Sequence, residues 1–153
     1  MSGWKFGRLS EERLKMLHPD LETVLRAALP HSPFDFGIGK SSIRTIEEQK
    51  RLVAEGRSRT MNSRHIPRVP INPSIYGFSI PQAVSHAADL LVYRAPGELS
   101  WEAADFTRVA EVVKRVAGEK GVTIEWGGDW RSFFDGPHFQ LPWAFYPVRA
   151  SLA

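Results

Sequence analysis

The chain reads WGGDWRSFFDGPHFQL at residues 126–141, and within this run Asp135 stands three residues before His138. Far upstream it carries the letters SRH ending at His65, and later SHAAD ending at Asp89. Two histidines and an aspartate on three separate segments can form one site only when the fold brings those segments together. The pattern therefore predicts a domain built around a site that three remote parts of the chain share.

These residue types indicate hydrolytic metal chemistry. A hydrolytic zinc site uses three nitrogen or oxygen ligands, keeps a fourth position open for water, and has a nearby carboxylate that takes a proton. The chain has no cysteine. A Cys-rich structural zinc site and disulfides are therefore excluded, and any zinc must be bound by histidine and carboxylate.

Four short motifs occur in order along the chain: Ile43-Arg44-Thr45, Ser63-x-His65, Ala87-x-Asp89 and Asp135-x-x-His138. With these motifs the chain resembles the zinc D,D-/L,D-peptidase family of peptidoglycan enzymes. Within that family, the run at 126–139 resembles the phage L-alanyl-D-glutamate endopeptidases that serve as endolysins. The resemblance extends from about Phe6 to Leu141. It implies a small α+β fold with a mostly antiparallel sheet backed by helices, of the zinc D-Ala-D-Ala peptidase and hedgehog-like type.

The resemblance also implies a role for each site residue. His65, Asp89 and His138 would bind Zn²⁺, and Asp135 would be the general base. Asp89 lies in an apolar segment, where a carboxylate is costly unless it is paired or metal-bound. Asp135 can alternatively be read as a turn residue before Gly-Pro.

Arg44 is the candidate for a positive group over the substrate. In the resembling enzymes an arginine in this context contacts the substrate, and a planar guanidinium suits a carboxylate or an oxyanion. Gln49 follows one turn later and is expected to orient Arg44. Trp130 is expected at the substrate-binding wall of the cleft. The alternative for Arg44 is a surface pair with Glu47 or Glu48.

The spacing departs from the family pattern in one place. The metal-binding His and Asp usually stand about seven residues apart in the family, whereas here residues 66–84 intervene. We interpret this segment as a loop insertion and expect it to form a lid or wall of the cleft. His86 is the alternative ligand, but strand alternation places His86 and Asp89 on opposite faces, which favours Asp89.

Length and composition set further limits. The 153 residues suit one domain, 1–153, with no separate wall-binding domain, and we expect a monomer. No apolar run reaches the length of a membrane span, and the first residues lack a signal peptide's apolar core. We therefore expect synthesis in the host cytoplasm and action on the wall after a holin permeabilises the membrane. The net charge is +3. The basic stretch at 57–64 lacks the interleaved aromatics of a nucleic-acid site, so a solvated loop beside the metal is favoured.

Local signals predict the elements. Serines at 10 and 100 suit helix N-caps, Pro19 suits a first helical turn, and Thr45 with Glu48 forms a capping box. The sequence thus predicts helices over 11–17, 19–29, 46–55 and 101–119, and strands over 34–38, 86–93, 122–126 and 138–141.

The function that follows is a zinc-dependent peptidoglycan endopeptidase that hydrolyses the L-alanyl-D-glutamate bond. Two alternatives remain open at this level. One is a D-Ala-D-Ala carboxypeptidase or dipeptidase, and the other is a zinc-containing wall-binding module without catalysis. The presence of Asp135 favours an enzyme, because a module that only binds needs no base there.

Overall fold

The computed structural model describes residues 1–150 and shows an antiparallel sheet with the strand order β1-β2-β5-β4, with β3 also paired to β2. The strands are β1 (Asp35–Ile38), β2 (Ala87–Ala95), β3 (Glu98–Leu99), β4 (Glu125–Trp126) and β5 (His138–Gln140). The α+β fold expected from the sequence is confirmed.

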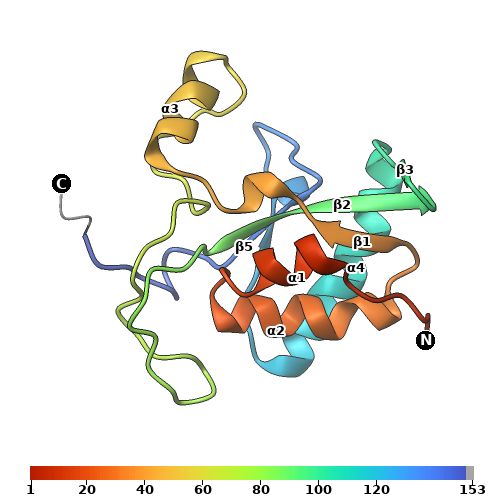
Figure 1. The fold of residues 1–153 in the computed structure, drawn as a ribbon, viewed down its shortest axis with the longest axis horizontal. Coiled ribbons are helices and arrows are strands. Elements are labelled where there is room, and N and C mark those ends of the chain that lie inside the picture. The colour runs from red at the N-terminus through yellow and green to blue at the C-terminus, as the bar shows by residue number, and fades with distance from the viewer. Residues whose placement is uncertain (151–153) are drawn as a thin grey trace.

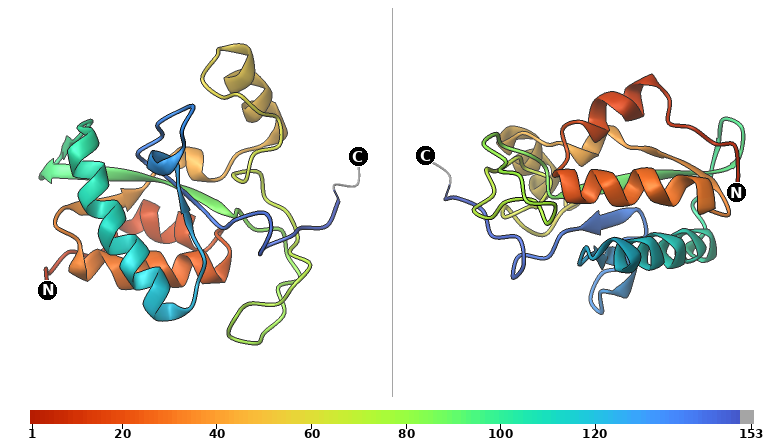
Figure 2. Two further views of the ribbon diagram at one scale, coloured as in Figure 1. Left: turned by 180° about the vertical axis from the view of Figure 1, so that it is seen from behind. Right: turned by 90° about the horizontal axis from the view of Figure 1, so that it is seen from below.

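Within residues 1–150, four α-helices accompany the sheet: α1 (Arg8–Leu14), α2 (Pro19–Ala28), α3 (Ile46–Ala54) and α4 (Ala103–Lys120). Short 3₁₀ helices η1 (Leu29–His31), η2 (Lys40–Ser42) and η3 (Gly127–Asp129) join them. Helices α2 and α4 pack against each other, and their apolar faces share one core with the sheet. Helix α3 stands apart from that pair, at the opposite end from the N-terminus (Figures 1 and 2).

The register of the sheet positions the candidate site. β2 pairs with β5 so that Asp89 lies directly opposite His138, and Ala88 lies opposite Phe139. Directly opposed residues on an antiparallel pair point to the same face. The apolar neighbours Ala88 and Phe139 therefore enter the core, while Asp89 and His138 meet on the other face.

The helix signals were partly correct. Pro19 begins α2, the capping box of Thr45 and Glu48 begins α3, and α4 ends at Gly121, whose φ of +74° is a left-handed cap. The predicted cap at Ser10 was wrong, because α1 begins at Arg8 and the Ser10 hydroxyl instead accepts from Ile38 N on β1 at 3.0 Å.

The helix cap predicted at Ser100 and the strand predicted over 122–126 also differ from the structure. Glu102, and not Ser100, is the N-cap of α4; the Ser100 hydroxyl accepts from Glu102 N at 3.2 Å and donates to Asp105 at 2.6 Å. The strand predicted over 122–126 is limited to Glu125–Trp126, which pair with Gln140 and Phe139.

The 66–84 loop lies beside the start of α2. Ser74 Oγ donates to Asp20 Oδ1 at 2.5 Å, and Ile75 N donates to Asp20 Oδ2 at 3.2 Å. One antiparallel β-bridge between Arg68 and Val84 closes the base of the loop. No residue of 66–84 lines the cleft that contains the candidate site. The structure therefore does not support a lid, and Figure 1 shows the loop extending past α2 instead.

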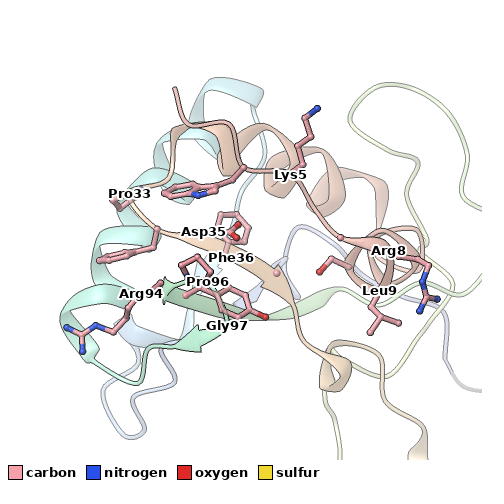
Figure 3. Close-up of a pocket in the computed structure, with 16 residues that line it drawn as sticks. Lys5, Arg8, Leu9, Pro33, Asp35, Phe36, Arg94, Pro96 and Gly97 are labelled. Carbon is pink, nitrogen blue, oxygen red and sulfur yellow. The ribbon is translucent and has the colours of Figure 1, made fainter.

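A separate cavity of about 780 Å³ lies at the other end of the sheet and shares no lining residue with that cleft. Figure 3 shows Asp35 between the N-terminal segment, which carries Lys5 and Arg8, and the turn that carries Arg94 and Gly97. Burial raises the pKa of the Asp35 carboxyl group. Within residues 1–150, no helix is both long and apolar enough to cross a membrane.

Candidate metal centre and active-site cleft

Three donor atoms from three segments converge on one point. His65 Nε2 lies 3.0 Å from His138 Nδ1 and 3.3 Å from Asp89 Oδ1, and the latter two atoms are 3.4 Å apart. His65 and His138 are buried and Asp89 is mostly buried. This group could hold a metal ion.

The second nitrogen of each imidazole ring has its own acceptor. His65 Nδ1 lies 3.1 Å from Ser42 O, and His138 Nε2 lies 2.7 Å from Gln140 Oε1. Because both partners are carbonyl oxygens, each of these ring nitrogens carries a proton, which leaves the other nitrogen of each ring to face Asp89. Two lone pairs and a carboxylate oxygen would repel one another at such distances, so the group requires positive charge, either as protons on the rings or as a bound cation.

The carboxylate of Asp89 is held at its other oxygen. Asp89 Oδ2 accepts from Ser41 Oγ at 2.7 Å and from Arg44 Nη2 at 3.1 Å, so Oδ1 is left for the cluster. Burial by itself would raise the pKa of this carboxyl group, but His65 and His138 hold the pKa well below its usual range. Asp89 is thus an anion with one oxygen fixed by the protein and one available to a metal.

Arg44 and Gln49 form a connected pair, as the sequence suggested. Arg44 Nη1 donates to Gln49 Oε1 at 3.1 Å, and Arg44 Nε donates to Ser41 O at 2.9 Å. Gln49 is fully buried, and its amide donates to Thr60 O at 2.6 Å. Arg44 also lines the cleft, and its carboxylate partner is Asp89, not a glutamate of α3.

Asp135 faces the same cleft from the loop before β5. Its carbonyl accepts from His138 N at 3.2 Å, and its amide donates to Gly127 O at 3.1 Å. A Cβ on Gly127 would come within 2.4 Å of Asp135 O and 2.8 Å of Asp135 Cβ, so only glycine permits this approach. Burial, and then the negative charge of Asp89, raises the pKa of the Asp135 carboxyl group.

The remaining residues of the aromatic run shape the cleft, which has a volume of about 440 Å³. Trp130 lies on its wall, with its ring centroid 4.9 Å from that of His138. Trp126 is buried, and its indole N–H donates to Gly136 O at 2.7 Å. Asp129 is exposed and pairs with Lys114, in keeping with a structural role at the turn.

His86 lies outside the cluster. Its Nδ1 is 3.1 Å from Val84 O, and its ring is buried against His18, with 5.1 Å between the ring centroids. His18 caps α2 by accepting from Asp20 N at 3.0 Å. The geometry therefore favours Asp89 over His86 as the third donor.

Several residues that support the site were not predicted from the sequence. Ser41 and Ser42 lie in η2, directly before the Ile43-Arg44-Thr45 motif but outside it. Gln140 could have been found, because a residue two positions after His138 on a strand points to the same face. Gln140 is itself oriented by its amide, which donates to Glu125 Oε2 at 3.1 Å.

The fold and the site place the protein in a class of proteins, the metal-assisted hydrolases. It is a small antiparallel α+β domain with a His-Asp-His group and a further carboxylate beside that group. Residues 1–141 match the phage L-alanyl-D-glutamate peptidase family, and the chain belongs to that family. The chain is therefore a peptidase, as the motifs predicted.

Individual proteins agree with this assignment. The chain is 28% identical to the L-alanyl-D-glutamate peptidase of Escherichia phage T5, over 90% of this chain and 98% of that protein. It is 26% identical to the peptidoglycan L-alanyl-D-glutamate endopeptidase CwlK of Bacillus subtilis (strain 168), over 82% of this chain and 73% of that protein. The crystal structure of the Serratia marcescens L-Ala D-Glu endopeptidase ChiX superposes with a TM-score of 0.76 at 34% identity, covering 94% of this chain and 95% of that one.

Proposed function

We propose that this protein is a zinc-dependent endopeptidase that hydrolyses the L-alanyl-D-glutamate bond of bacterial peptidoglycan. The observation that carries the proposal is the convergence of His65, Asp89 and His138, of which the two histidines line one cleft together with Asp135. The names of the relatives, which specify this bond, support the choice of substrate.

The donor set fits zinc. Zinc bound at about 2.0–2.1 Å in a tetrahedron has ligand atoms about 3.3 Å apart. The three separations here are 3.0, 3.3 and 3.4 Å. Two imidazoles and one carboxylate are also the ligand types of catalytic zinc sites. When bound, zinc supplies Lewis acidity that lowers the pKa of a water molecule toward about 7.

The protein's own groups supply the remaining chemistry. Asp135 accepts the proton of the attacking water and returns it to the leaving amine, a role that suits a carboxylate in the same cleft as His65 and His138. Arg44 holds Asp89 and presents positive charge to the cleft, where an oxyanion develops during hydrolysis. Trp130 forms an apolar wall against His138 and restricts the position of the peptide.

Digestion of purified sacculi tests the bond. Mass spectrometry of the products should show new D-Glu amino termini, with L-Ala left on the glycan. Released D-Ala would favour the carboxypeptidase alternative, and new reducing sugar ends would contradict a peptidase. An absence of any cleavage by the zinc-loaded protein would leave the binding-module alternative.

Metal analysis of single variants tests the ligands. Asp89→Ala and His138→Ala should each lose stoichiometric zinc, whereas His86→Ala, whose ring lies outside the cluster, should keep it. Full zinc occupancy in Asp89→Ala would contradict the assignment. The lytic role expected of an endolysin is tested by the turbidity of bacterial cells whose membrane has been permeabilised, which should fall when the wild-type protein is added.

A further inference from the structure

The cleft beside the metal group carries an excess of positive charge. In the described part of the chain, four arginines line it, at positions 44, 57, 59 and 64, whereas Asp135 is the only Asp or Glu among the lining residues. Asp135 is reserved for proton transfer in the proposed function. Among the lining residues that the structure describes, no other carboxylate therefore remains to pair with these arginines.

Three of these arginines already have a function in the protein. Arg44 is paired with Asp89 at 3.1 Å, and Arg57 lies 3.5 Å from the carboxylate of Glu55. Arg64 is buried, and its guanidinium lies 3.9 Å from the ring centroid of Trp143. Arg44 and Arg57 are therefore engaged by carboxylates of the protein. The guanidinium of Arg64 still has two N–H groups, at Nε and Nη1, without an acceptor within residues 1–150, but the residue is only 3% exposed.

Arg59 differs from them. Within residues 1–150 it makes no ion pair with a carboxylate. Its side chain crosses to the opposite loop, where Nη1 donates to Ser132 O at 3.4 Å and the guanidinium lies 4.9 Å from the ring centroid of Phe133. These contacts fix the direction of the side chain and leave Nε and Nη2 without a protein acceptor in the described part of the chain.

We propose that Arg59 is the specificity residue that binds the free carboxylate of the glutamate on the leaving side of the scissile bond. This inference rests on the proposed function. A glutamate whose amine is acylated by alanine has two carboxyl groups, α and γ. One of them forms the next peptide bond, and the other remains a free carboxylate. The planar fork of an arginine recognises a carboxylate with two parallel hydrogen bonds.

The position of Arg59 suits this role. Ser132 and Phe133, which it contacts, precede Asp135 by only a few residues on the same loop. A substrate carboxylate bound at Arg59 therefore lies against the segment that carries the base. Orientation of a substrate relative to a catalytic group accelerates the reaction, so the contact should raise kcat/KM and not only binding.

The test uses two synthetic peptides that differ by one charge. One is an N-acylated L-Ala-γ-D-Glu-L-Lys, and the other carries an amide in place of its free glutamate carboxylate. The wild-type protein should cleave the acid with a kcat/KM about 10- to 100-fold above that of the amide, the range for a hydrogen bond to a charged group. Arg59→Gln should lose this preference by slowing cleavage of the acid alone, and Arg59→Lys should keep an intermediate preference.

Arg131→Gln is the matched control, because Arg131 is exposed, carries the same charge on the same loop, and does not line the cleft. Equal losses in Arg131→Gln and Arg59→Gln would show general electrostatic attraction and overturn the proposal. The proposal would also be overturned if Arg59→Gln kept the wild-type preference for the acid peptide. Equal cleavage of both peptides by the wild-type protein would overturn it too, while leaving the proposed function intact. If the wild-type protein cleaves neither peptide nor sacculi, the proposed function fails and this inference fails with it. Stoichiometric zinc in each variant verifies that the site is folded.

Discussion

Replacement of Gln140 by methionine should weaken zinc binding without removing any ligand. Gln140 Oε1 accepts from His138 Nε2 at 2.7 Å, and both side chains are buried. Methionine has a similar length and no comparable acceptor, so the ring N–H of His138 would be left unsatisfied and the ring would be free to rotate. The bond therefore fixes both the proton and the orientation of a metal ligand.

The size of the effect follows from that single contact. A buried donor left without its acceptor costs about 1–3 kcal/mol. In binding terms this is a factor of about 10–100 in the zinc dissociation constant, which is also the usual range for the loss of a group that supports a metal-binding histidine. The loss of the Gln140 donor to Glu125, at 3.1 Å, adds a smaller cost to the fold.

Competition titration with a coloured zinc chelator measures the dissociation constant directly. Gln82→Met, which changes an exposed glutamine of the 66–84 loop, is the matched control and should bind zinc as the wild type does. Urea unfolding of both metal-free proteins separates damage to the fold from damage to the site. Wild-type zinc affinity in Gln140→Met would refute the reasoning that this hydrogen bond positions His138.

Three further results are expected. Asp135→Asn should retain zinc and fold but lose at least about 10²-fold in kcat, the low end for removal of a general base, and a near-wild-type rate on sacculi would exclude that role. Gly127→Ala should lower the free energy of unfolding by about 1–3 kcal/mol and lower kcat, because the Cβ of the alanine would displace Asp135. Unchanged urea unfolding and an unchanged kcat would contradict the close approach of the two residues. Burial lowers the pKa of His18 to about 4 and of His86 to about 3. Below about pH 6.5 the unfolded chain therefore binds more protons than the folded protein. The free energy of unfolding of the metal-free protein should fall as the pH falls from about 6.5 toward those pKa values, by about 1.4 kcal/mol per pH unit for each histidine. His86→Gln should make this acid dependence shallower in urea unfolding, and an unchanged slope would show that His86 does not titrate this way.

Local signals predicted the elements whose ends depend on nearby residues. The capping box at Thr45 and the glycine at 121 were correct because each is satisfied within its own helix. Ser10 and Ser100 were wrong as caps because their hydroxyls are used elsewhere, by Ile38 N on β1 and by Asp105. A pattern of residue types does not show which of two partners a hydroxyl takes.

The candidate site was predictable as a set of residues but not as a geometry. The motifs named the three donors and Asp135. The structure brings the three donors together, and the two histidines and Asp135 line one cleft. The pairing of Asp89 with His138 depends on a long-range register that no local pattern contains. The position of the 66–84 loop was missed for a related reason: its anchor is the buried carboxylate of Asp20 at the start of α2, remote in sequence and unmarked by any motif.

The long interval between His65 and Asp89 is compatible with the site because neither residue is positioned by the chain between them. His65 is held by its ring bond to Ser42 O at 3.1 Å and by Arg44 N, which donates to His65 O at 3.1 Å. Asp89 is held by the β2–β5 pairing opposite His138. Closing a loop that grows from about 7 to about 24 residues costs only about 1 kcal/mol more in entropy. The contacts of Ser74 and Ile75 with Asp20 offset part of that cost. Insertion at this point therefore changes the outer surface of the protein and leaves the three donor atoms together.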